Sequence, residues 1–317
     1  MKKLSFLIIL LTILLGNFAF AIENNTPTQN SKDFLHTIKF KKHTEIPDEI
    51  LIRTLFDNYN KYTNNKNLDN FLALHDSSYC SSDGYNKEKL KELAIESWKE
   101  YPKVRYSIKV LMVNVDIDNA TVITSERLNG ITNTTVDFVK GNGFIDSEST
   151  SIYYLKKFSN EWRIISDFVV NEKTSMRFGI AKLIPMTIDA PALVAPNTEY
   201  TAVLKANIPK EYVALISLNN EQITFPQIKS TEVFRGMKSN GIKERILISN
   251  NDNKNENAIA SIGIAKPSIK NDNINISLLG MAFLSSRVNV IDKKIPNNTE
   301  IANQTINNKE IKEVATK

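Results

Sequence analysis

The segment that most constrains the fold of this chain is 152–170. It reads Ile-Tyr-Tyr-Leu-Lys-Lys-Phe-Ser-Asn-Glu-Trp-Arg-Ile-Ile-Ser-Asp-Phe-Val-Val, two apolar runs joined through the tetrad Phe158-Ser159-Asn160-Glu161. Two runs rich in β-branched and aromatic residues around a short polar break are typical of a β-hairpin. Both faces of the second run, 162–170, are apolar. We therefore expect this strand to be central in a curved sheet that helices cover on one side.

Three amphipathic helices are expected before this sheet. The first begins after Pro47-Asp48-Glu49 and places apolar residues on one face at helical spacing. The second is short, with its apolar residues within 68–74. The third runs from Asn86 to Tyr101, where Pro102 stops it.

The apolar period changes from helical to two after the third helix. Residues 106–112 alternate between apolar and polar, and the apolar face then shifts by one residue from Val113 to Ile117. Such a shift predicts a β-bulge and a bent strand. The turn residues at 116–119 and the alternation that resumes at 120–124 predict a hairpin partner.

This order of elements resembles the nuclear transport factor 2-like superfamily. The stretches that carry the resemblance are 113–122, Val-Asn-Val-Asp-Ile-Asp-Asn-Ala-Thr-Val, and 155–164, Leu-Lys-Lys-Phe-Ser-Asn-Glu-Trp-Arg-Ile, and it covers about 48–170. The resemblance implies an α+β cone, three helices on a curved antiparallel sheet, and frequent dimerisation through the open sheet face. It does not imply one function, since the superfamily includes isomerases, cyclases, dehydratases, transport factors and non-catalytic binding domains.

A catalytic cone would need an acid or base inside it. In members that act on ketosteroids or polyketides, the resemblance implies a carboxylate, often with a Tyr or His, whose pKa burial raises toward neutrality. The candidates in this sequence are the carboxylates Asp167, Asp83, Glu126 and Asp146 and the hydroxyls Tyr59 and Tyr106. Asp167 is the strongest of them, because its neighbours Ser166 and Phe168 should face the other side of the sheet. Strand carboxylates usually point to water, so we favour a cone without catalysis.

Neither a reactive thiol nor a metal site is expected. Cys80 is the single cysteine and lies near His75, but closeness in sequence is not spatial pairing, and the three histidines form no cluster with it at ligand spacing. The Asn-rich run 250–257 has the oxygen atoms that calcium prefers. It contains Lys254 and no Gly for a tight turn, so we expect a solvated hairpin loop there, and no cofactor or metal anywhere.

The second half of the chain has the pattern of an all-β unit. Its apolar, β-branched runs are 200–206, 212–218, 245–249, 258–265 and 274–291, separated by Asn, Pro, Lys and Gly. Short strands at this spacing indicate an antiparallel β-sandwich, for which an immunoglobulin-like arrangement is one option. The last run is either two strands bent at Gly280 or one long strand.

The expected domain boundaries follow from these patterns. They are a signal peptide 1–21, a flexible leader 22–47, a nuclear transport factor 2-like domain 48–178, a linker 179–196, a β-sandwich domain 197–293 and a disordered tail 294–317. The signal peptide rests on Lys2 and Lys3, the apolar run 4–15 and the small-x-small site Ala19-Phe20-Ala21. An uncleaved membrane anchor is the alternative, but it would need a longer apolar run.

These features favour an exported bacterial protein, periplasmic or extracellular, with no stable membrane anchor after cleavage. The formal charge of +5 is spread without a basic stripe, which argues against nucleic acid as a partner. We expect a non-catalytic ligand-binding or assembly module of the cell envelope, with a small hydrophobic ligand or an envelope protein as partner and a homodimer as one option. The alternative is an isomerase, cyclase or dehydratase working inside the cone. A third option is a sandwich that binds surface polysaccharide or protein through exposed aromatic side chains.

Overall fold

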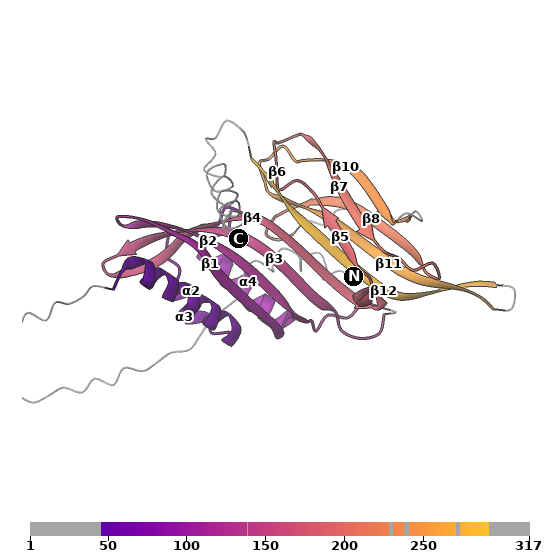
Figure 1. Ribbon diagram of the computed structural model, residues 1–317, viewed down its shortest axis with the longest axis horizontal. Helices are drawn as coiled ribbons and strands as arrows, with labels where there is room; N and C mark the ends of the chain where they lie inside the picture. Colours follow the sequence, from indigo (N-terminus) through magenta and orange to yellow (C-terminus); the bar gives the residue numbers. More distant parts are fainter. Residues whose placement is uncertain (1–45, 138, 228–230, 238–240, 271–272, 292–317) are drawn as a thin grey trace, which may run out of the picture.

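One long, curved antiparallel sheet runs through the whole molecule, as a computed structural model of the chain shows (Figure 1). The structure describes residues 46–137, 139–227, 231–237, 241–270 and 273–291. The predicted signal peptide, all but the last two residues of the predicted leader, and the predicted tail lie outside these residues.

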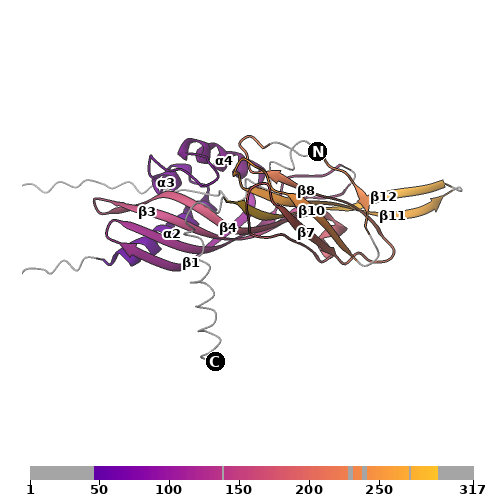
Figure 2. The same ribbon diagram turned by 90° about the horizontal axis from the view of Figure 1, so that it is seen from above.

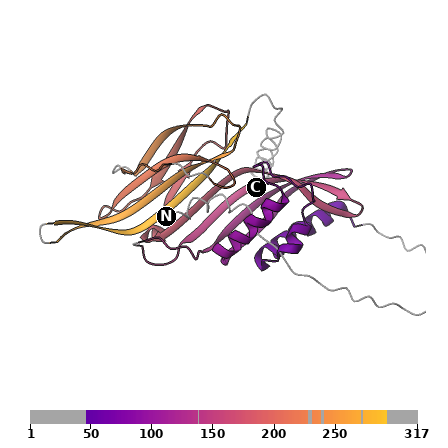
Figure 3. The same ribbon diagram turned by 180° about the vertical axis from the view of Figure 1, so that it is seen from behind.

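The three predicted helices are confirmed. They are α2 (Asp48–Asn65), α3 (Leu68–Ala73) and α4 (Lys87–Glu100), and they lie together on one face of the sheet (Figure 3). Asn86 caps α4, because its side chain accepts a hydrogen bond from the Lys89 backbone N–H at 3.0 Å. None of the helices in the described ranges has the length and apolar character needed to cross a bilayer.

The cone sheet follows the sequence pattern closely. Its strands are β1 (Lys103–Asp116), β2 (Asn119–Ile131), β3 (Phe144–Phe158) and β4 (Glu161–Gly179), paired in this order. Both predicted hairpins are confirmed, and so is the predicted bulge, which interrupts the β1–β2 register between Val110 and Met112. The helices are fastened to the second hairpin, because Asp48 accepts a hydrogen bond from Trp162 Nε1 at 2.8 Å.

The second half forms two facing sheets. The strands are β5 (Met186–Asp189), β6 (Leu193–Val194), β7 (Glu199–Ala206), β8 (Val213–Gln222), β9 (Arg235–Gly236), β10 (Ile242–Ile248), β11 (Glu256–Lys270) and β12 (Asn273–Val290). The small sheet β10-β7-β5 packs on β8, β11 and β12 through a shared apolar core (Figure 2). Of the two options for the last run, one long strand is correct, with a register shift at Leu279, next to Gly280.

The structure differs from the expected separation of the two halves by a linker. Residues 173–179 of β4 pair with 280–286 of β12, so the cone sheet continues into the sandwich as one sheet of order β1-β2-β3-β4-β12-β11-β8-β9. Most of the expected linker, 179–196, forms the 3-10 helix η2 (Ile180–Leu183) and the strands β5 and β6. The physical reason is apolar burial, since Ile184, Met186 and Ile188 lie in the sandwich core.

Candidate functional site

The loop between α3 and α4 carries Asp83, one of the two charged residues of the candidate site. It runs along the edge of β4 that β12 leaves free: the backbone N–H groups of Asp76, Cys80 and Ser82 donate to carbonyl oxygens of β4 residues 164–167 at 2.9 to 3.1 Å. β12 pairs with the same edge further along, at 173–179. The end of the loop, at Asp83, therefore meets the end of β12, at Arg287.

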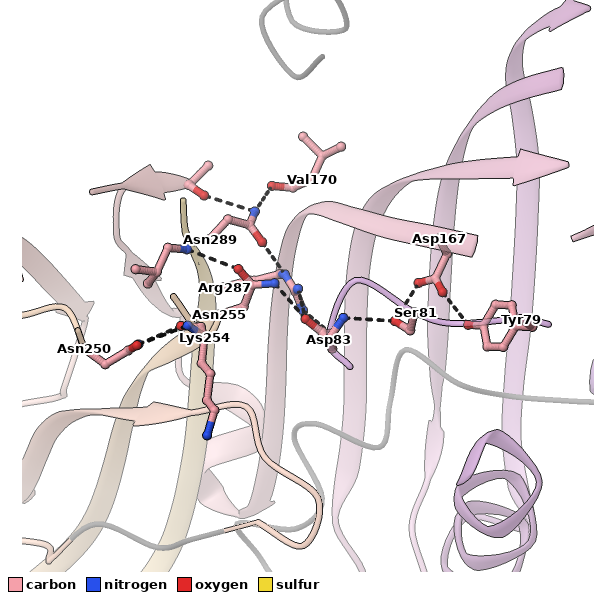
Figure 4. A network of polar contacts seen from close by, with 12 residues as sticks. Tyr79, Ser81, Asp83, Asp167, Val170, Asn250, Lys254, Asn255, Arg287 and Asn289 are labelled. Atoms are coloured by element: carbon pink, nitrogen blue, oxygen red, sulfur yellow. Dashed lines mark hydrogen bonds and ion pairs between the residues drawn. The ribbon is translucent and has the colours of Figure 1, made fainter. Parts of the chain in front are cut away.

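A buried ion pair joins these two elements at the seam between cone and sandwich (Figure 4). The Arg287 guanidinium contacts the Asp83 carboxylate with both terminal nitrogens, at 2.5 and 3.0 Å, and the two side chains are 1 and 5% exposed. Asn255 donates to the same carboxylate at 2.8 Å. Burial opposes the charge of Arg287, but the carboxylates around it, Asp83 foremost, together leave the pKa of the guanidinium above its ordinary value.

Further hydrogen bonds fix Arg287 in place. Its Nε donates to Asn289 Oδ1 at 2.9 Å, and the amide nitrogen of Asn289 donates to the Val170 carbonyl oxygen at 2.8 Å. Asn255 also accepts a hydrogen bond from the backbone N–H of Val290 at 3.1 Å. The ion pair thus belongs to a network that ties the α3–α4 loop, β4 and the end of β12 together.

Asp167 lies inside the cone, beside Ser81 of the α3–α4 loop. Its carboxylate accepts hydrogen bonds from the Tyr79 hydroxyl and, at 3.4 Å, from Ser81 Oγ (Figure 4). Burial raises the pKa of Asp167 to about 6, against the opposing effect of the Tyr79 hydrogen bond. The alternation argument placed this side chain on the covered face, and the structure places it there.

Glu126, Tyr106 and Tyr59 come together in the cone interior. Glu126 accepts hydrogen bonds from the hydroxyls of Tyr106, Thr124 and Tyr153, at 2.8 Å for Thr124 and 3.0 Å for Tyr153. Burial raises the pKa of Glu126, and these hydrogen bonds oppose the rise. The Tyr59 ring packs against Tyr106 and Tyr153 with centroids 5.9 and 6.1 Å apart. The side chains of the chain itself occupy this part of the cone.

Asp146 lies on the outer surface of the sheet, whereas Asp83 lies at the seam and the other candidates lie inside the cone. Its side chain is 32% exposed and pairs with Arg127 at 3.2 Å on the sheet surface. The reason is the alternation of β3, in which its neighbours Ile145 and Ser147 are the buried residues.

Cys80 and His75 are held by different partners. His75 is buried, its Nδ1 lies 2.9 Å from the Phe71 carbonyl oxygen, and burial lowers its pKa to about 4. The Cys80 thiol contacts the Ser81 carbonyl oxygen at 3.6 Å. Within the described residues, no three His, Cys, Asp or Glu side chains meet in a group that could hold a metal ion.

The Asn-rich run 250–257 forms a turn that uses its own oxygen atoms. Asn250 Oδ1 accepts from the backbone N–H groups of Asp252 and Lys254, at 3.0 and 3.1 Å. Glu256 is buried and accepts from the Tyr200 hydroxyl at 2.7 Å. These contacts agree with a hairpin loop.

Sequence reasoning missed two buried charges of the site, Arg287 and Glu172. Burial raises the pKa of Glu172 to about 7, against the charge of Arg287. A signal for Arg287 exists, since a lone Arg stands within the apolar alternation of 281–290. Such an arginine needs a buried carboxylate, but the sequence does not say which one.

A cavity of about 690 Å³ opens beside the ion pair. It lies between the α3–α4 loop and two turns of the sandwich, and we call it the seam cavity. Its lining residues are Cys80, Ser82, Asp83, Gly84, Tyr85, Asn86, Lys89, Ile223, Thr224, Phe225, Asn253, Lys254 and Asn255. Its wall mixes amide, hydroxyl and charged groups with apolar side chains, and Phe225 packs edge-on against Tyr85 at 5.1 Å.

Comparisons with known proteins do not assign the chain to a family. No family model and no curated protein matches it. Among solved structures, a conserved protein from Planctomyces limnophilus is similar at 13% identity and a TM-score of 0.34, over 39% of this chain and 96% of the other. A hexachlorocyclohexane dehydrochlorinase, LinA type 2, is similar at 14% identity and a TM-score of 0.34, over 38% of this chain and 83% of the other. Likenesses at these values carry no argument about function.

Proposed function

We propose that the protein is an exported module of a bacterial cell envelope that binds a ligand or partner without catalysing a reaction. The observation that supports this most is the filled cone. Glu126 and Asp167 already accept hydrogen bonds from the chain's own hydroxyl groups, and aromatic rings pack beside them. A substrate would have to displace these contacts, which leave buried polar groups satisfied. In this proposal the cone is a scaffold.

The seam cavity is the binding site in this proposal. Its volume lies within the roughly 300–1,000 Å³ of small-ligand sites. The amides of Asn86 and Asn253 and the hydroxyl of Ser82 offer hydrogen bonds, and Lys254 adds positive charge, whereas Lys89 is paired with Glu92 at 2.7 Å. The charge of Asp83 is matched by Arg287 behind it, so the cavity has an excess of positive charge. Such a wall suits a hydroxyl-rich anion, and we propose an acidic oligosaccharide as ligand.

A titration with tetragalacturonate, followed by amide NMR, tests this site. We expect the backbone signals of Asn86, Asn253 and their neighbours to shift at millimolar ligand. Lys254→Glu should weaken binding about fivefold or more, because it replaces attraction with repulsion. Lys266→Glu is the matched control, since Lys266 is an exposed lysine outside the cavity wall. An absence of shifts at the cavity, or an equal loss in the control, would contradict the assignment.

An enzyme working inside the cone is the second candidate function. The observation in its favour is the pKa of Asp167, which burial raises to about 6 beside the Tyr79 hydroxyl. The same NMR experiment separates the two functions when a panel of small hydrophobic ketones replaces the saccharide. Shifts centred on Asp167 and Tyr153 would favour the enzyme, and an unchanged cone favours the scaffold.

Export itself predicts a defined mature terminus. When the full chain is expressed in a Gram-negative bacterium, we expect cleavage after Ala21, because the preceding residues have the charge, apolar run and small-x-small site of a signal peptide. N-terminal sequencing of the periplasmic or secreted protein should therefore begin at Ile22. Recovery of the protein with Met1 intact in the membrane fraction would favour the uncleaved anchor.

A further inference from the structure

A second cavity, of about 770 Å³, opens at one end of the sandwich. At this end β7 finishes and β5, β8 and β10 begin. The lining residues are Pro185, Met186, Thr187, Lys205, Ala206, Asn207, Ile208, Pro209, Lys210, Tyr212, Val213, Ala214, Leu215, Gly236, Met237, Gly241 and Ile242. We call it the end cavity. It shares no residue with the seam cavity, and its volume is also that of a small-ligand site.

The wall of the end cavity is largely aliphatic and partly open to solvent. Val213, Leu215 and Ile242 are 44, 51 and 40% exposed, although they are large apolar side chains. Met186 and Ala214 continue the apolar wall into the sandwich core. Single exposed aliphatic residues are ordinary, but several around one cavity mark a binding surface for an apolar group.

The charged groups at this cavity are positive. Lys205 and Lys210 line it and are exposed, and none of the described lining residues is acidic. Lys205 lies 4.0 Å from Asp189, which is already bound to Lys173 at 2.5 Å. A ligand that fits this wall therefore has an apolar body and an anionic group.

We propose that the end cavity binds a single-chain anionic amphiphile, a long-chain carboxylate. Its alkyl chain lies against Val213, Leu215 and Ile242, and its carboxylate lies at Lys205 and Lys210. This site goes beyond the saccharide site at the seam, and either site can exist without the other.

Binding of a fluorescent polyene fatty acid to the purified full chain tests the proposal. We expect saturable binding and displacement by dodecanoate, with affinity rising about fourfold for each added CH₂ group until the cavity is full. Dodecanol, which has the chain without the charge, should bind at least about fivefold more weakly.

Two variants and a control locate the binding site. Gly236→Leu should abolish binding, because Gly236 lines the cavity and an added Cβ would meet nothing within 4 Å, so that the fold can accept the side chain. Lys210→Glu should weaken dodecanoate binding about fivefold or more and leave dodecanol binding unchanged. Lys61→Glu, on the exposed face of α2, is the matched control and should bind like the unaltered protein.

Three results of the binding assay would overturn the proposal. They are no displacement by dodecanoate at millimolar concentration, an equal effect of Lys61→Glu, or equal binding of dodecanol and dodecanoate. Flotation with anionic vesicles distinguishes a free fatty acid from a membrane lipid as the source. Vesicle binding that survives Gly236→Leu, without dodecanoate binding, would place the lipid on the surface and also overturn the cavity site.

Discussion

Replacing Arg287 with Met should lower the free energy of unfolding by about 3–5 kcal/mol, the largest effect we expect from one substitution. The carboxylate of Asp83 is 5% exposed and would lose both contacts with the guanidinium. Asn255 would remain as a donor at 2.8 Å, but one neutral amide does not compensate a buried charge. Urea unfolding followed by circular dichroism would measure the change.

A double-mutant cycle separates the unpaired charge from lost packing. Asp83→Asn combined with Arg287→Met leaves no buried charge in the pair, and we expect this double variant to be more stable than Arg287→Met alone. Arg163→Met is the control, because the Arg163 side chain is 40% exposed and its ion pair with Glu161 should contribute less than about 1 kcal/mol. If the double variant were no more stable than Arg287→Met, packing rather than charge would explain the loss.

Much of the cone could be predicted because its signals are local. The turn between Phe158 and Glu161, the bulge after Val110 and the capped start of α4 each depend on neighbours within a few residues. Alternation along β4 also placed Asp167 on the covered face, where Tyr79 meets it. A strand or a helix face can be read from such spacing.

The joining of the two halves could not be predicted. β4 and β12 pair between 173–179 and 280–286, about a hundred residues apart in sequence. Alternation says which face of a strand is apolar, but it does not say which strand lies beside which edge. The prolines at 185, 191 and 196 favoured a linker. In the structure these prolines flank the short strands β5 and β6, which pack against the sandwich core.

In the candidate site, too, local sequence patterns do not give the contacts between residues far apart in the chain. Asp83 was a candidate because it lies in the loop before α4, but its partner, Arg287, is separated from it by 204 residues. No pattern among neighbouring residues in the sequence distinguishes an ion-paired carboxylate from a catalytic one. Glu126 and Asp167 face the interior, whereas Asp146 faces solvent, as the exposed fractions show. Sequence alternation can indicate which carboxylates face the interior, but it does not give their partners.

In our proposals the cone is a scaffold and the two cavities are binding sites. Glu126 and Asp167 inside the cone accept hydrogen bonds from neighbouring hydroxyls, whereas the groups at the seam and at the sandwich end face space that a ligand can occupy. Because β4 pairs with β12, the cone braces the strand that carries Arg287 and Asn289. A scaffold that holds loops rigidly lowers the entropy cost of binding at them.

Asp167→Asn should stabilise the protein at pH 8 by up to about 3 kcal/mol. Burial raises the pKa of Asp167 from its ordinary value, 3.8, to about 6. Each factor of ten in an ionisation equilibrium corresponds to about 1.4 kcal/mol, so holding this carboxylate ionised in the fold has that cost. Asn keeps the acceptor for the Tyr79 hydroxyl and has no charge.

The sign follows from which state binds more protons. Below pH 4, Asp167 is protonated in both the folded and unfolded chains, and its favourable contribution is complete. Between pH 4 and 6 the unfolded chain loses the proton first, so this contribution is lost as pH rises, and above pH 6 the loss is constant. Glu172, whose pKa is raised to about 7, should act in the same direction up to pH 7.

Urea unfolding of the unaltered protein, Asp167→Asn and Glu172→Gln at pH 4, 6 and 8 measures this dependence. Each variant should differ little from the unaltered protein at pH 4 and be more stable at pH 8. Asp146→Asn is the matched control, because its side chain is 32% exposed and pairs with Arg127 on the surface. If Asp167→Asn were the less stable protein at pH 8, the ionised carboxylate would stabilise the fold, and Tyr79 would be donating to a charge that the cone requires.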